Sequence, residues 1–117
     1  MTAESNGHEA NDFAALDARL RAFAISRDWQ RNHNPKNLGM SLAIEVGELL
    51  ECFQWLNDDQ ARMVKYQPAK MEQIRSELAD VFIYLMYLAN ALDIDLLAAA
   101  WEKMDINEHR FTPKVSE

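Results

Sequence analysis

Residues 76–92 read SELADVFIYLMYLANAL, and this stretch decides the fold. Beyond Asp80 it is apolar at nearly every position, so a helix formed here is apolar on all of its sides. A helix of that kind is buried all round. A chain of 117 residues has a shallow core that can hardly surround such a helix. The stretch therefore predicts a long helix that lies at an interface between copies of the chain.

The composition limits the cellular compartments and the partners that suit the protein. The apolar stretch contains Asp80 and Asn90 and is shorter than the ~20 residues that a helix needs to cross a bilayer. Residues 1–11 are polar and show no signal peptide. Cys52 is the only cysteine, which excludes an intrachain disulfide and suits a reducing compartment. Because the net charge is −7, nucleic acid is a poor partner. We expect a cytoplasmic protein that binds neither membrane nor nucleic acid.

Helical patterns continue on both sides of the central stretch. Apolar residues recur at spacings of three and four, and only three Gly and three Pro interrupt them. The fold class is therefore all-α, a four-helix bundle over residues 12–111, with tails over residues 1–11 and 112–117. The predicted helices span residues 12–29, 38–56, 68–92 and 96–108, with a short additional helix over 59–66.

Four carboxylates on two of these helices carry the chemistry. Glu45 and Glu48 are spaced i, i+3 on one helix, and Glu77 and Asp80 share the same spacing on another, so each pair shares a helix face. No Lys or Arg lies three or four residues from any of them. Like charges at this spacing destabilise a helix. The pattern predicts a cation between the two helices.

The donor set indicates which cation. Carboxylate oxygens are the protein ligands that Mg²⁺ and Mn²⁺ prefer. A di-iron bundle would need Glu-x-x-His motifs, and none of the three histidines lies three residues after a Glu. We therefore expect Mg²⁺, with Mn²⁺ as the alternative. The remaining alternative is that the acids form an ordinary solvated helix face.

Aromatic and polar side chains accompany the acids. Trp55 follows Glu48 by seven residues and Tyr84 follows Asp80 by four, so both rings are predicted on the acidic faces. There they could stack a nucleotide base, or they could be core residues with a polar tip.

The helix over residues 96–108 carries two stripes. Leu97, Trp101 and Met104 form an apolar stripe that predicts core. Lys103 and Asn107 form a polar stripe that could bind phosphate oxygens or could simply face solvent.

Together these motifs resemble a known family. The words EVGEL at residues 45–49, ELADVFIYL at 77–85 and KMDIN at 103–107 resemble the signature of the MazG-like nucleotide pyrophosphohydrolases, which belong to the all-α NTP pyrophosphatase superfamily. Arg27-Asp28-Trp29, followed by His33, Pro35 and Asn37, is similar to the branch typified by dCTP pyrophosphatase. The resemblance covers residues 16–111.

The resemblance implies a reaction and a site. It implies Mg²⁺-dependent hydrolysis of a nucleoside triphosphate to the monophosphate and pyrophosphate, by a homodimer or homotetramer. We take Glu45 and Glu48 as the catalytic carboxylates, with Glu45 the first choice as proton acceptor. The implied metal ligands are Glu45, Glu48, Glu77 and Asp80, and the implied nucleotide contacts are Trp29, His33, Trp55, Tyr84, Lys103 and Asn107.

Because of three departures from the family pattern, the resemblance does not determine which nucleotide base the protein prefers. Asn32 stands where this branch often has Phe, Leu20 stands where some relatives have His, and residues 110–113 replace the more usual Arg-Tyr-Pro. We expect dCTP or a modified dCTP as substrate. The alternatives are dUTP, dATP or a damaged nucleotide, and, from another class, a non-catalytic helical interaction module.

Overall fold

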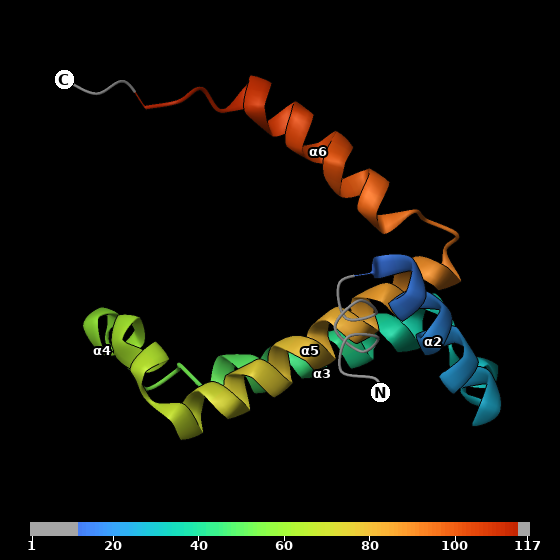
Figure 1. Cartoon of the computed structure of the whole chain (residues 1–117), viewed down its shortest axis with the longest axis horizontal. Helices are drawn as coiled ribbons and strands as arrows, with labels where there is room; N and C mark the ends of the chain where they lie inside the picture. The colour runs from blue at the N-terminus through green and yellow to red at the C-terminus, as the bar shows by residue number, and fades with distance from the viewer. Residues whose placement is uncertain (1–11, 115–117) are drawn as a thin grey trace.

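The structure, a computed structural model, describes residues 12–114, and all regular secondary structure in that range is helical (Figure 1). The predicted tail over residues 1–11 and the last three residues of the second tail lie outside the described range. The elements in chain order are α2 (Phe13–Ser26), η1 (Trp29–Asn32), α3 (Pro35–Glu51), α4 (Asp58–Met63), η2 (Val64–Tyr66), α5 (Pro68–Ala91) and α6 (Leu96–Arg110).

The all-α prediction is confirmed, whereas the count of four helices is wrong. The described range holds five α-helices, and the fifth is α4, which lies where the short additional helix over residues 59–66 was predicted. Asn57 and Gln60 build a capping box, in which each side chain accepts a hydrogen bond from the other's backbone N–H. Such a box satisfies two free donors at a helix start. It therefore gives α4 a definite beginning.

Local capping also moves other helix ends away from the predicted positions. α3 begins at Pro35 because the Asn34 side chain accepts the Asn37 N–H at 2.9 Å and proline suits the first helical position. α2 ends at Ser26, and Asp28 adopts the left-handed region with φ 58°. A left-handed residue stops a right-handed helix, so the predicted helix over 12–29 is divided.

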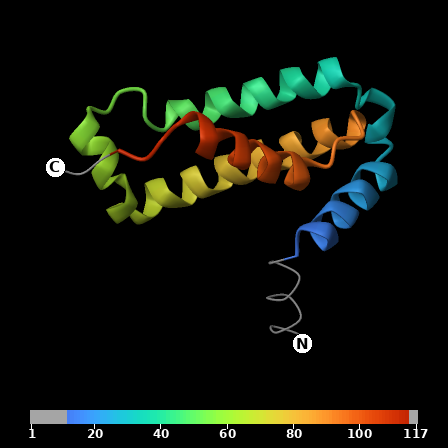
Figure 2. The same ribbon diagram turned by 90° about the horizontal axis from the view of Figure 1, so that it is seen from above.

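Two helices, α3 and α5, lie side by side along most of their length and form the body of the chain (Figure 2). α2 packs across one end of α5. There the Tyr87 hydroxyl donates to the Leu20 carbonyl oxygen at 2.9 Å. One core cluster fills that end, and a second, which includes the buried Cys52, fills the opposite end. The buried residues are Leu20, Ala24, Leu38, Met86 and Tyr87 in the first cluster, and Cys52, Val64 and Ile74 in the second.

The last helix leaves this body. At the end of α5, Ile94 N–H donates to Ala89 O at 2.9 Å and Asp93 N–H donates to Asn90 O, while Asp93 takes a φ of 54°. These two bonds around a left-handed residue form a Schellman cap. The chain turns there, and α6 runs off at 99° to α5.

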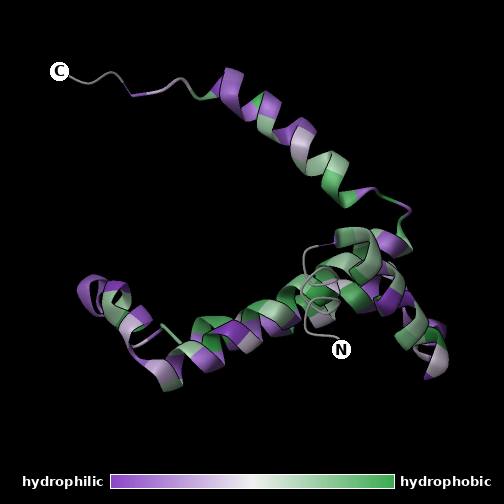
Figure 3. Ribbon diagram, viewed as in Figure 1, coloured by the Kyte–Doolittle hydropathy of each residue, from purple (hydrophilic) through white to green (hydrophobic). Residues whose placement is uncertain are grey.

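In the described part of the chain, α6 packs extensively against no other helix (Figure 1). The apolar stripe predicted as core is therefore open, and Trp101 is 69% exposed. Hydrophobic residues continue along α6 (Figure 3), and after Leu96, which packs against the first core cluster, those of the described chain are exposed. Leu78 and Phe82 on α5 are exposed as well. The bundle is thus not closed within the described part of one chain, and the predicted assembly as a dimer or tetramer stays a prediction.

No single helix among residues 12–114 is both long enough and apolar enough to span a membrane. Only the bent pair of α5 and α6 satisfies the length and composition requirements, and it does so jointly.

Candidate active site

Three of the four predicted acids meet between α3 and α5. Glu45 and Glu48 extend from α3 and Glu77 from α5, and one ligand oxygen of each lies within 4.8 Å of the others. Asp80 lies outside this group of three, one turn after Glu77. It is close enough that its charge contributes to raising the pKa of both Glu45 and Glu77. The helical spacing thus gathers four negative charges at one place in the α3–α5 groove.

The carboxylates of this cluster are incompletely compensated. Glu45 Oε2 and Glu77 Oε2 are buried and have no hydrogen-bond partner among residues 12–114. Burial, followed by the charge of Glu48, raises the pKa of both groups. The ion pairs among residues 12–114 use Asp17, Asp28 and Asp59 instead. A buried unpaired oxygen is costly. Because the donors are all carboxylate oxygens, the cluster fits a hard divalent cation such as Mg²⁺ or Mn²⁺.

The metal-free protein is expected to lose stability as pH rises. The raised pKa values of Glu45 and Glu77 mean that the folded chain binds more protons than the unfolded chain above the ordinary value of 4.5. Their stabilising contribution is complete below that value and is lost as pH rises through the raised pKa. Urea unfolding in a chelator, at about pH 5 and about pH 7.5, measures the loss. The Glu45→Gln variant should lose less, and an equal loss in both proteins would contradict the assignment.

A cavity of about 230 Å³ lies between η1, the first half of α3 and Tyr84 of α5. Three of the predicted nucleotide contacts, Trp29, His33 and Tyr84, line it. Asn37 also lines it, and its Nδ2 donates to the Asn32 carbonyl oxygen at 3.1 Å. Burial lowers the pKa of His33, so the imidazole is neutral near neutral pH. The remaining lining residues are Asn32, Leu38 and Ser41.

Helical spacing connects the cavity to the acids. On α3, Asn37, Ser41 and Glu45 follow one another at intervals of four, and on α5 Tyr84 follows Asp80 at the same interval. Residues at this interval lie on one helix face. The groove therefore presents aromatic and amide groups at one end and carboxylates at the other. Ser41 and Leu38 did not emerge from the sequence, although the row from Asn37 to Glu45 passes through Ser41.

Comparison with known proteins identifies the family. Residues 40–112 match the MazG-like family. The chain belongs to the MazG-like family.

Similar proteins have named activities. This MazG-like chain is 43% identical to dCTP pyrophosphatase 1 of Rattus norvegicus over 84% of its own length and 58% of that protein. It is 45% identical to dCTP pyrophosphatase 1 of Homo sapiens over 80% of its own length and 55% of that protein. It therefore spans less than three-fifths of the length of these curated relatives. The crystal structure of a pyrophosphatase from Archaeoglobus fulgidus is similar with a TM-score of 0.75 and 38% identity, over 84% of this chain and 90% of that one.

The structure does not bring every predicted contact to the groove of this MazG-like chain. Trp55 is 85% exposed, because α3 ends at Glu51 and the helical register that would place Trp55 on the Glu48 face ends with it. Lys103 and Asn107 lie on α6, which leaves the body after Asp93. Within one described chain, the groove therefore holds acids and aromatic rings, while the cationic phosphate contact stands apart.

Proposed function

We propose that this MazG-like protein is a nucleoside triphosphate pyrophosphohydrolase that releases a nucleoside monophosphate and pyrophosphate, with dCTP or a modified dCTP as the preferred substrate. The observation that supports the proposal is that α3 and α5 contribute residues both to an aromatic cavity and to a carboxylate cluster. A base in the cavity would direct its phosphates toward the acids. The names of the relatives from rat and human support the choice of dCTP.

The acids are proposed to bind the metal and to accept the proton of the attacking water. Glu48, Glu77 and Asp80 bind the ion, and Glu45 shares in binding. When bound, Mg²⁺ or Mn²⁺ would neutralise phosphate charge and lower the pKa of an attacking water. Glu45 is the proposed proton acceptor, because its carboxylate lies beside the other acids of the cluster and one of its oxygens accepts no hydrogen bond among residues 12–114.

The cavity is proposed to recognise the base. Trp29 and Tyr84 offer ring faces for stacking, which is tolerant of base identity. Discrimination of cytosine from thymine requires hydrogen bonds at the base edge. The neutral His33 ring, the Asn37 amide oxygen and the Ser41 hydroxyl are the polar groups placed to make them.

The working unit is proposed to be a homodimer or homotetramer in which α6 of one copy lies over the groove of another. Two observations support this. α6 has an exposed apolar stripe, and α5, one of the two helices that form the groove, exposes Leu78 and Phe82. Burying these surfaces together would be favourable. It would also bring Lys103 and Asn107 to the phosphates. The single free thiol of Cys52 and the negative net charge suit a cytoplasmic enzyme that does not bind nucleic acid.

The proposal is tested by product analysis with a panel of triphosphates. With Mg²⁺, the purified protein should release pyrophosphate from dCTP with a higher kcat/KM than from dUTP, dATP or UTP, and a chelator should stop the reaction. Orthophosphate release, or turnover without a divalent ion, would contradict the mechanism. A protein that shows neither turnover nor a thermal shift with Mg²⁺ and nucleotide would be an interaction module instead.

A further inference from the structure

One aromatic residue stands behind the cavity rather than in it. Tyr87 lies on α5, three residues after Tyr84, and is 6% exposed. Its ring centroid is 4.8 Å from that of His33 and 6.2 Å from that of Tyr84. It does not line the cavity, yet it touches two residues that do.

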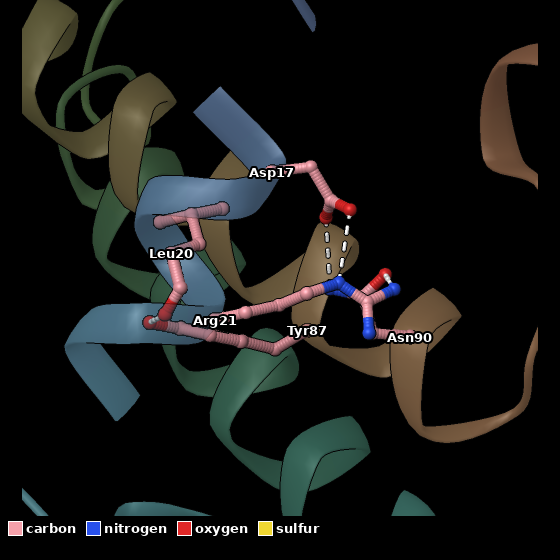
Figure 4. Close-up of polar contacts among 5 residues, drawn as sticks. All are labelled: Asp17, Leu20, Arg21, Tyr87 and Asn90. Carbon is pink, nitrogen blue, oxygen red and sulfur yellow. Dashed lines mark hydrogen bonds and ion pairs between the residues drawn. The ribbon is translucent and has the colours of Figure 1, made fainter. Parts of the chain in front are cut away.

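The hydroxyl of Tyr87 reaches a different element. It donates to the Leu20 carbonyl oxygen in the middle of α2, as Figure 4 shows. The carbonyl has a second lone pair available beyond its helical hydrogen bond. Burial raises the pKa of Tyr87, so the hydroxyl keeps its proton and remains a donor. One turn further along α2, Phe23 packs edge-on against Trp29 with centroids 5.2 Å apart. Tyr87 thereby ties down the helix that supports the Trp29 wall.

His33 depends on such support. It follows η1 and lies outside any helix, and among residues 12–114 its ring is held by the rings of Trp29 and Tyr87 rather than by a hydrogen bond. Of these two rings, that of Tyr87 is the closer and the more buried. Aromatic contacts of this geometry favour one ring orientation over others.

We propose that Tyr87 is the positioning residue of the cavity: its ring fixes His33 and its hydroxyl fixes the part of α2 that supports Trp29, so that both walls are preformed for the base. The inference rests on the proposed function for its kinetic consequence. Tyr87 touches no metal-cluster residue in the contacts above, so it acts on nucleotide binding and not on the chemical step. A defect in uniform binding raises KM and leaves kcat unchanged.

The test separates the ring from the hydroxyl. Tyr87→Leu removes both, and its KM for dCTP should rise about tenfold while kcat stays within about threefold. Tyr87→Phe keeps the ring, and its KM should rise only about two- to threefold. Asn90→Ala is the matched control: Asn90 lies three residues on and also ties α5 to α2, through Asp17 and Arg21, without touching the cavity (Figure 4). Its KM should stay within about twofold of the wild type.

The outcomes are distinguishable. An unchanged KM in folded Tyr87→Leu, or an equal rise in Asn90→Ala, would overturn the positioning role. The wild-type protein supplies a measurement that needs no variant: the His33 ring protons, assigned with His33→Gln, should be shifted by the Tyr87 ring in the NMR spectrum of the free protein. A His33 signal at its unstructured position in the folded wild type would overturn the role even if no ring-free variant folds. If the wild type turns over no triphosphate while this shift is present, the proposed function fails and the contact stands.

Discussion

The Glu48→Gln variant should lose about 10²- to 10³-fold in kcat with dCTP and Mg²⁺, because several kcal/mol of transition-state stabilisation depend on the ion that the carboxylates are proposed to hold. Glu48 lies between Glu45 and Glu77 in the cluster, and its charge raises the pKa of both. Its replacement removes a ligand and lowers the negative charge that attracts the cation. The variant should also lose the increase in Tm that Mg²⁺ gives the wild type.

Without metal, the same variant should be at least as stable as the wild type. Removing one of several crowded charges relieves repulsion in the cluster, so the loss of activity cannot be assigned to unfolding. Glu72→Gln is the matched control, because it removes one exposed carboxylate from α5 away from the cluster and should keep activity within about twofold. Retention of a tenth or more of the activity by Glu48→Gln, or an undiminished response of its Tm to Mg²⁺, would contradict the metal assignment.

Mixing two inactive variants should restore activity if the site is shared between copies. Lys103→Ala alone should lose about ten- to a hundredfold, because a charge-assisted bond to phosphate is missing. In a mixed pair, the acids of the Lys103→Ala copy meet the intact α6 of the Glu48→Gln copy. Random pairing in a symmetric dimer makes half of the pairs mixed and leaves one of two sites intact in each, so about a quarter of the wild-type activity should return. Activity after dissociation and reassociation of the mixture, with light scattering to confirm the assembly, provides the measurement.

The control mixture combines Glu48→Gln with Glu77→Gln. Both substitutions lie on the acidic side of the site, so no pairing produces an intact site and no activity should return. If the first mixture gives mixed pairs but no rescue, Lys103 acts within its own chain or not at all, and the shared site is wrong.

The acidic cluster could be predicted from the sequence because it depends on spacing within single helices. Glu45 and Glu48 share a face wherever that helix goes, and so do Glu77 and Asp80. The pairing of the two acidic helices does not follow from this spacing. The long apolar stretch at residues 76–92 favoured it, because such a helix must pack against its neighbours. The tighter group of three, with Asp80 set apart, required the structure.

Trp55 and α6 were beyond the sequence for different reasons. Trp55 would share a face with Glu48 if the helix were continuous. The chain instead forms a turn at Cys52, whose backbone N–H donates to Leu49 and Leu50. No proline or glycine lies among residues 48–56, so the end of the helix could not be predicted there. For α6, the apolar stripe predicts burial. It does not indicate whether the surface that buries it belongs to the same chain or to another copy. An amphipathic pattern states that a face needs a partner, and it does not state where the partner is.

If the site is shared between copies as proposed, the departure of α6 at Asp93 makes activity depend on the protein's concentration. In a single copy, Lys103 on α6 stands apart from the carboxylates of the cluster. With a shared site, the turnover per subunit would therefore fall on dilution and rise as the protein concentration increases. Scarce protein would then leave the triphosphate pool untouched, and abundance alone would serve as the switch.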